Sequence, residues 1–159
     1  MADRAYLDGL RLLGRRELSQ AQLRQRLTRR AHSPEDIEAA VERLKAERAL
    51  DDARTAGAIA RTATAVKRLG PRRVRRAIQS AGISEDLTEA AVQSVFEEVD
   101  LEALIETTLD RRLASQQGPI DDRTAARLYR HLLAQGHDAD LVARALRARR
   151  SRHGRDEKT

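Results

Sequence analysis

Apolar residues recur along this chain at the spacing of amphipathic helices, and the pattern itself repeats. Adding 54 to five residue numbers matches apolar residues with apolar residues and glycine with glycine: Val74, Ile78, Gly82, Leu87 and Val92 become Leu128, Leu132, Gly136, Leu141 and Leu146. An earlier copy, offset by about 50, runs through Leu23, Leu27, Ile37 and Val41. A fixed period of this kind predicts stacked helical units, none of which buries its apolar face alone.

Start signals divide each unit into short helices. Ser19 is followed three residues later by Gln22, the pattern of a capping box, in which each side chain satisfies the backbone N–H of the other. Further starts occur at Ser33-Pro34, Asp51 or Asp52, Gly70-Pro71, Ser84, Asp100, Asp121 or Asp122, and Asp138. No segment alternates with the period of two that strands require. The sequence therefore predicts an all-α fold, an elongated tandem of three three-helix repeats.

The unit boundaries follow from these signals. We expect three three-helix repeats, over residues 1–50, 51–99 and 100–150. Residues 151–159 have no apolar periodicity, and we expect them to form a flexible basic tail. Helical spacing places the apolar residues of each helix on its inward face, and it assigns Ala31 and Val66 to that face.

Composition and charge indicate the kind of partner. Of the 159 residues 40% are hydrophobic but only 2% aromatic, so Leu, Ile, Val and Ala must build the core, which suits small helical units. The net charge of +6 favours an anionic partner such as nucleic acid. All but three of the basic residues are arginine, whose planar fork suits phosphates and carboxylates. The base composition of the genome explains that excess equally well.

Other classes of protein are disfavoured. The chain has no cysteine and therefore no disulfide framework or thiolate metal site. No run approaches the roughly 20 apolar residues that span a bilayer, and charged residues from Asp3 to Arg11 interrupt any signal-peptide core. We therefore expect a cytoplasmic protein with no membrane contact.

Positive charge gathers on the middle helix of each predicted unit. Because apolar residues take the opposite side of the second unit's middle helix, Arg72, Arg73 and Arg76 should project outward together. The candidate DNA-binding or filament-binding residues are Arg24, Arg26, Arg29, Arg30, Arg72, Arg73, Arg75, Arg76, Arg111, Arg112, Arg123, Arg127 and Arg130. Three such patches would follow a phosphate backbone. The alternative is that they are solvated helix faces that keep a small-core protein soluble.

Negative charge is equally segregated. Between Ala77 and Asp110 there is no lysine or arginine, and acidic residues gather around one helix junction: Glu97, Glu98, Glu102 and Glu106. One hypothesis is that these four face a basic surface of a protein partner while the arginines face nucleic acid. Intramolecular pairing between adjacent units is the competing interpretation.

No pattern in the chain predicts catalysis. It contains neither the phosphate-binding G-x-x-x-x-G-K-[ST] loop nor a G-x-G-x-x-G segment. His131 and His137 straddle a predicted helix end; we expect His131 to be an exposed partner of Arg127 or Arg130, and His137 to be a turn residue, rather than metal ligands. We expect no enzyme activity, no metal and no cofactor.

Four short segments occur in order along this frame. They are Arg15-Arg16-Glu17-Leu18-Ser19 with Leu23 and Leu27, Leu50-Asp51-Asp52-Ala53-Arg54 with Ala56, Gly70-Pro71-Arg72-Arg73-Val74 with Gly82-Ile83, and Gln135-Gly136-His137. These segments resemble the R-R-E-x-S-x-x-E-L, L-D-D-x-R-F-A, G-P-x-R-I with K-G-I, and R-G-F stretches of the RecX family. The resemblance covers about residues 5–148.

The resemblance implies a bacterial modulator of RecA, the recombinase that forms helical filaments on single-stranded DNA. It implies tandem three-helix repeats that lie in the filament groove, inhibit ATPase activity and strand exchange, and promote filament disassembly. We therefore expect a non-enzymatic, monomeric regulator of DNA repair and the SOS response, with the RecA filament and single-stranded DNA as partners.

The chain departs from the family pattern at four positions. Thr55 and His137 replace phenylalanines, Gln22 replaces a glutamate and Ala81 replaces a lysine. Losing two aromatics should loosen packing in the second and third units or shift the binding surface.

Two other classes of protein compete with this interpretation. A plain single-strand binder usually relies on exposed aromatic residues, of which this chain has few. A basic helical-repeat scaffold would have a partner unrelated to DNA.

Overall fold

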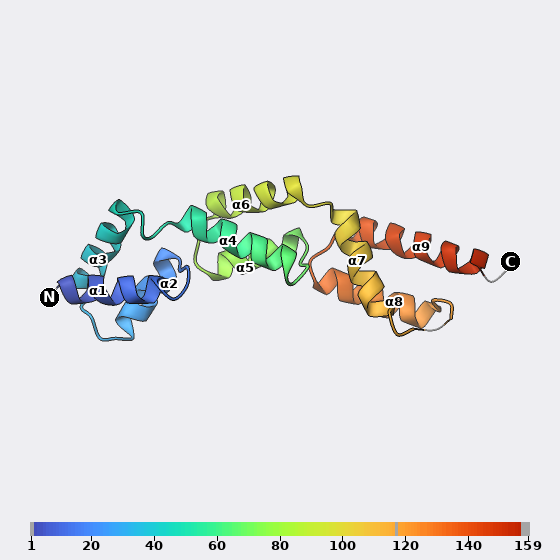
Figure 1. The fold of residues 1–159 in the computed structure, drawn as a ribbon, viewed down its shortest axis with the longest axis horizontal. Helices are drawn as coiled ribbons and strands as arrows, with labels where there is room; N and C mark the ends of the chain where they lie inside the picture. Colours follow the sequence, from blue (N-terminus) through green and yellow to red (C-terminus); the bar gives the residue numbers. More distant parts are fainter. Residues whose placement is uncertain (1, 117, 157–159) are drawn as a thin grey trace.

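Three helical units lie in a row along one long axis (Figure 1). The computed structural model describes residues 2–116 and 118–156, and all regular structure within them is helical. The units comprise α1 (Ala2–Leu13), α2 (Gln20–Thr28) and α3 (Pro34–Ala46); α4 (Asp52–Ala65), α5 (Pro71–Ser80) and α6 (Glu85–Glu98); and α7 (Leu101–Leu113), α8 (Asp122–Ala134) and α9 (Ala139–Asp156). The predicted all-α tandem of three-helix repeats is confirmed.

Most of these helices have an N-terminal cap formed by a side chain close in the sequence. In the capping box of α2, the Gln22 backbone N–H donates to the Ser19 hydroxyl and the Ser19 N–H donates to the Gln22 side chain, both at 3.1 Å. Asp51, rather than its neighbour, caps α4, and Asp121 caps α8. Ser84 takes the cap position of α6, but its side chain makes no capping hydrogen bond.

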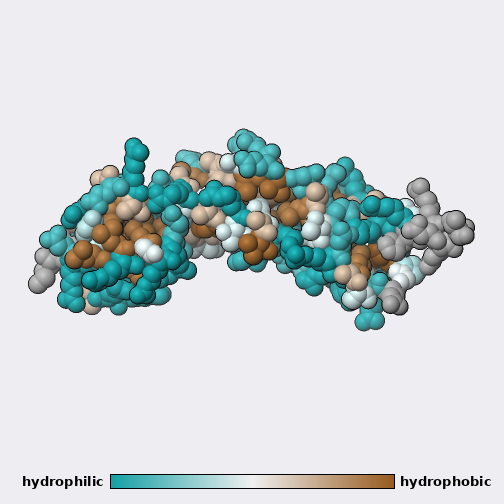
Figure 2. Space-filling model, in the orientation of Figure 1, coloured by the Kyte–Doolittle hydropathy of each residue, from teal (hydrophilic) through white to brown (hydrophobic). Residues whose placement is uncertain are grey.

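Each unit buries its own apolar cluster, built from the repeating positions. The buried sets include Leu23, Leu27 and Val41; Val74, Ile78 and Val92; and Leu128, Leu132 and Leu146. Apolar residues show through a mostly hydrophilic face in each of the three units (Figure 2). The expectation that no unit buries its apolar face alone was wrong, because the three helices of each unit pack on one another and enclose a cluster of their own.

Three residues assigned to inward faces lie outside them. Leu7 belongs to α1, but its position around the helix leaves it 49% exposed. The other two lie beyond helix ends. Ala31 follows the end of α2 with a φ of 61° and is exposed, and the side chain of Val66, just after α4, is also exposed. Both assignments were wrong because helical periodicity does not extend past the last turn of a helix. At the other end of the chain, α9 continues to Asp156, into the segment expected to be a flexible tail; residues 157–159 lie outside the described residues.

The second and third units join where the C-terminal turn of α8 meets the start of α5. The Gly70 N–H donates to the Gln135 carbonyl at 2.9 Å, and the Arg72 N–H donates to the Gly136 carbonyl at 3.3 Å. Free donors of one helix start are thus satisfied by free acceptors of another helix end, and opposite dipole poles meet. This explains why Gly70, the cap residue of α5, needs no capping side chain.

The first and second units join in a similar way. The Ser19 hydroxyl at the start of α2 donates to the Ala81 carbonyl at the end of α5. The Thr55 hydroxyl on α4 lies 3.2 Å from the Leu18 carbonyl. The middle helices α8, α5 and α2 therefore form a column in which each helix end meets the start of the next.

The two ends of this column differ from its joints. Ala31 takes the left-handed position that Gly82 and Gly136 occupy in the other units. By the 54-residue offset, Thr124 of the third unit corresponds to Gly70, the cap residue of α5. The cap residue of α8 is Asp121, three residues before Thr124, so α8 begins about one turn earlier than α5 does. Terminal repeats commonly differ from inner ones because the array must end in water.

Candidate nucleic-acid interface

The column of middle helices carries a row of exposed arginines. On α5, Val74 and Ile78 are fully buried while the arginines on the other side of the helix are exposed. We define the basic row as the exposed arginines of α5 and α8: Arg72, Arg73, Arg76, Arg123, Arg127 and Arg130. Because α8 ends where α5 begins, the row continues from the third unit to the second.

Two candidate arginines each form a two-pronged ion pair with a glutamate of their own unit. Arg24 donates to both carboxylate oxygens of Glu38, at 2.8 and 3.0 Å, and Arg75 pairs with Glu89 in the same two-pronged way. The two pairs occupy equivalent positions of the first and second repeats. Each arginine lowers the pKa of its glutamate by hydrogen bonding. These arginines link the middle helix to the third helix of the unit.

The other candidates of the first unit lie at and beyond the middle of α2. Arg30 approaches the Asp8 carboxylate at 3.3 Å, and the same carboxylate accepts from His32 at 2.9 Å and from Arg11 at 3.0 Å. The hydrogen bond from His32 is the main cause of a lowered pKa for Asp8. Arg29 is exposed and Arg26 is half-buried.

The third-unit candidates are divided between two helices. Arg111 and Arg112 are exposed on the last turn of α7, and Arg112 approaches the C-terminal half of α8. The Arg112 guanidinium lies 3.5 Å from Nδ1 of His131. The prediction that His131 pairs with an arginine of its own helix was therefore wrong, because the approach of α7 is decided by tertiary packing.

The four acidic candidates do not form one surface. Glu102 lies 3.7 Å from Arg144, and Glu106 pairs with both Arg149 and Arg152 of α9. This intramolecular pairing occurs within the third unit rather than between adjacent units.

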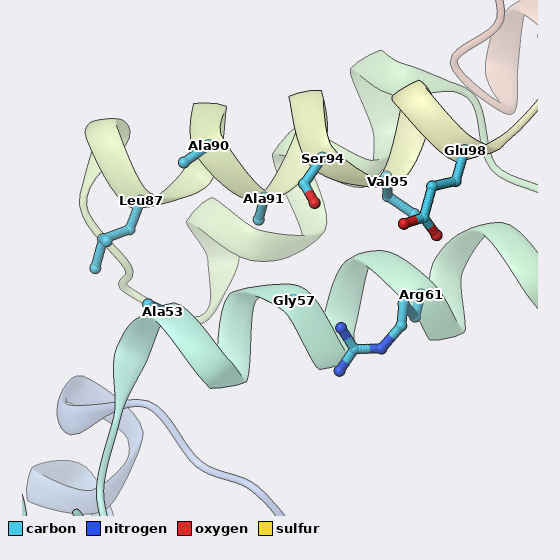
Figure 3. A pocket seen from close by; sticks show the side chains of 9 residues that line it. All are labelled: Ala53, Gly57, Arg61, Leu87, Ala90, Ala91, Ser94, Val95 and Glu98. Atoms are coloured by element: carbon cyan, nitrogen blue, oxygen red, sulfur yellow. The ribbon is translucent and has the colours of Figure 1, made fainter.

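The remaining two, Glu97 and Glu98, are exposed at the end of α6. Glu97 accepts a hydrogen bond from the Gln93 side chain at 3.1 Å, whereas Glu98 lines a groove between α4 and α6 (Figure 3).

This groove has a volume of about 340 Å³ and a floor of small side chains. Ala53 and Gly57 come from α4, and Ala91 comes from the facing side of α6 (Figure 3). Arg61 and Glu98 lie toward the same end of the groove, on opposite helices (Figure 3). The groove offers space for a side chain but no group placed for catalysis.

Both aromatic replacements are buried at joints between units. Thr55 is 1% exposed and its hydroxyl also lies 2.9 Å from the Asp51 carbonyl. His137 is 1% exposed, and its Nε2 lies 3.0 Å from the Arg68 carbonyl. Because a carbonyl only accepts, Nε2 carries the proton and donates. His137 is therefore part of the joint between the second and third units, a role that its position in a turn did not reveal.

The described residues show no cation-binding cluster. Within them, no group of three or more His, Cys, Asp or Glu is placed to hold a metal ion. No helix among them is long and apolar enough to cross a membrane.

The fold and the arginine row define a tandem three-helix-repeat protein with a basic column. Comparison with known proteins gives the family. The model of the first RecX three-helix domain matches residues 5–44, and that of the second matches residues 51–92. The chain belongs to the RecX family.

Relatives and solved structures extend the match through the third unit. "Regulatory protein RecX" of Leptothrix cholodnii is 33% identical over 92% of this chain and 90% of its own length, and that of Halorhodospira halophila is 32% identical over 87% and 84%. The crystal structure of RecX from Lactobacillus salivarius matches with a TM-score of 0.77 at 15% identity, over 92% of this chain and 95% of that one. A second RecX crystal structure gives a TM-score of 0.74 at 21% identity, over 88% and 68%. These two structures support the fold.

Proposed function

We propose that this protein binds the RecA filament on single-stranded DNA and inhibits the recombinase's ATPase activity and strand exchange. It acts without enzymatic activity of its own, in DNA repair and control of the SOS response, as a cytoplasmic monomer. Membership of a family whose members are named regulatory proteins supports the regulatory role.

One observation supports the proposal: the middle helices of two units lie end to end, and both carry exposed arginines. A strand of DNA presents phosphates at regular intervals, so an extended row of cations matches it better than a single patch does. The elongated body (Figure 1) is the shape expected of a protein that contacts neighbouring subunits of a filament. Glu97 and Glu98, at the end of α6, remain candidates for contact with the recombinase.

The proposal is tested by the rate of ATP hydrolysis by RecA on single-stranded DNA while this protein is titrated in. A steep fall at well below one copy per recombinase is expected if the protein caps or dismantles filaments. An unchanged rate of hydrolysis, with the DNA already saturated by recombinase, would favour the alternative that this is a basic helical-repeat protein with another partner.

A charge-reversal variant tests the arginine row. Replacing Arg72, Arg73 and Arg76 with glutamate should abolish DNA-dependent binding without unfolding the protein, because all three side chains are exposed. The matched control carries the same change at three exposed arginines of other helices: Arg4, Arg61 and Arg147. Equal DNA-dependent binding by the two variants would contradict a specific role for the row.

A further inference from the structure

An open basic pocket of about 230 Å³ lies at the joint between the second and third units. We call it the joint pocket, and its lining residues are Lys67, Arg68, Thr108, Arg111, Arg112, His131 and Gln135. They come from the segment after α4, from α7 and from α8. The volume is several times the roughly 30 Å³ that a water molecule occupies in the liquid, so a tetrahedral oxyanion fits.

The charges of this pocket are uncompensated by carboxylates. No acidic residue lines it. Among the described residues, the structure gives no ion pair to Lys67, Arg68, Arg111 or Arg112, in contrast to the paired Arg24 and Arg75. Like charges that are held close together repel one another even in water. Gathering four cations therefore costs free energy that an anion in the pocket would recover.

The joint holds the two sides of the pocket in place. Arg68 has a φ of 52°, a left-handed conformation that is unfavourable for a residue other than glycine. Its carbonyl accepts the hydrogen bond from the buried His137 of the third unit. The adjacent bond from Gly70 to Gln135 fixes the end of α8. The pocket is thus preorganised, and it is complete only when both units are docked.

His131 is the titratable imidazole of the joint pocket. Burial, followed by the positive charge of Arg112, lowers the pKa of its imidazole below the ordinary value. The other charged groups that face the pocket are Lys67, Arg68 and Arg111, and all of them are cationic. A bound dianion opposes this repulsion, so it would raise the pKa of His131.

We propose that the joint pocket binds a phosphate group of single-stranded nucleic acid, as a fixed anchor beside the basic row. The phosphate chemistry stands on the pocket itself, while the identity of the strand as filament DNA rests on the proposed function. Nucleic acid is favoured over a protein carboxylate because His131 lies one helical turn after Arg127 of the basic row, and at the next residue after Arg130. A strand that enters the pocket therefore meets further cations for its neighbouring phosphates.

The test compares two charge-matched variants of the full-length protein. The pocket variant, Arg111→Gln with Arg112→Gln, removes two positive charges from the α7 side of the pocket. The control variant, Arg4→Gln with Arg61→Gln, removes the same charge from exposed positions on α1 and α4. The probe is a fluorescent single-stranded thymidine oligonucleotide, with binding measured over a series of salt concentrations. The pocket variant should bind roughly tenfold more weakly and its salt slope should fall by about 1, whereas the control stays close to the wild type.

A second measurement needs no variant. Sulfate, which stays a dianion over the pH range in which histidine titrates, is added to the wild-type protein while the His131 ring is followed by NMR. Its pKa should rise on addition of sulfate, and the same addition should leave His131 of the pocket variant unshifted.

Equal oligonucleotide binding by the pocket and control variants would overturn the proposal, as would a His131 pKa that ignores sulfate. Loss of recombinase inhibition in the pocket variant with intact oligonucleotide binding would assign the pocket to protein carboxylates and also overturn it. A wild-type protein that binds sulfate and oligonucleotide through the pocket but leaves RecA hydrolysis unchanged would support the pocket and refute the proposed function.

Discussion

Gly70→Ala tests the joint between the second and third units. The φ of Gly70 is −78°, so alanine adopts this backbone without strain. Its Cβ, however, would lie 2.5 Å from the carbonyl carbon and oxygen of Gly136 and 2.6 Å from the backbone nitrogen of His137. Carbon atoms in contact prefer about 3.5–4.0 Å, so the two helix ends must move apart by about 1 Å.

The cost follows from what that movement breaks. A separation of about 1 Å stretches the 2.9 Å bond from Gly70 to Gln135 beyond hydrogen-bonding range. Each lost hydrogen bond costs about 0.5–1.5 kcal/mol, and overpacking of a close contact typically costs about 1–3 kcal/mol. The joint should therefore lose about 2–4 kcal/mol, enough to let the third unit swing relative to the second.

Urea unfolding followed by circular dichroism measures the loss of stability, and small-angle X-ray scattering measures the change in shape. Gly57→Ala is the matched control: the nearest atom to its Cβ is a guanidinium nitrogen of Arg61 at 3.1 Å, the mobile end of a flexible side chain. Alanine in that helix interior should stabilise the protein by about 0.5–1 kcal/mol. A Gly70→Ala protein with wild-type stability and an unchanged scattering curve would refute the close-packed joint.

Two further changes probe the third unit. Burial lowers the pKa of His137 despite its hydrogen bond to the Arg68 carbonyl. At a pH below 6.5, the ordinary pKa of histidine, the unfolded chain therefore binds a proton that the folded joint does not. Stability should therefore fall as pH drops below about 6.5, and His137→Phe should remove up to about 1.4 kcal/mol per pH unit of that dependence in urea titrations. Leu128→Asp places an unpaired charge at a site that is 4% exposed, which costs about 4 kcal/mol or more and should unfold the third unit in circular dichroism melts.

A different result would contradict each of these two predictions. Parallel pH profiles for the wild type and His137→Phe would mean that the imidazole is protonated equally in both states. For Leu128→Asp the control is Leu7→Asp, at a leucine that is 49% exposed. If both variants melt like the wild type, the helical register of α8 is wrong.

Helix starts were predictable because they depend on contacts between residues close in sequence. The capping box of Ser19 and Gln22 needs only a separation of three residues and a helical backbone. The same holds for Asp51 and Asp121, whose side chains each accept from the backbone N–H three residues later. The sequence could not say which of two adjacent aspartates caps a helix, since either one satisfies the local pattern.

The errors arose where local patterns meet tertiary contacts. Val66 continues the apolar spacing of α4, yet the helix ends before it and no neighbouring helix covers it. His137 has the sequence context of a turn, and only the docking of two units buries it against Arg68. Clusters of arginine were visible in the sequence, but the pairing of Arg75 with a glutamate 14 residues away was not.

The sequence by itself determined the all-helical class, the three-fold repeat and the family, because apolar periodicity and caps are local and recur at a fixed interval. Tertiary structure alone decided how the units meet. The close approach of Gly70 and Gly136 joins α8 to α5, and it brings Lys67 and Arg68 to the arginines at the end of α7. The bond from Ser19 to Ala81 adds α2 to the column. Such contacts join residues more than 30 positions apart. No periodicity encodes them, since they depend on two surfaces fitting at van der Waals distance.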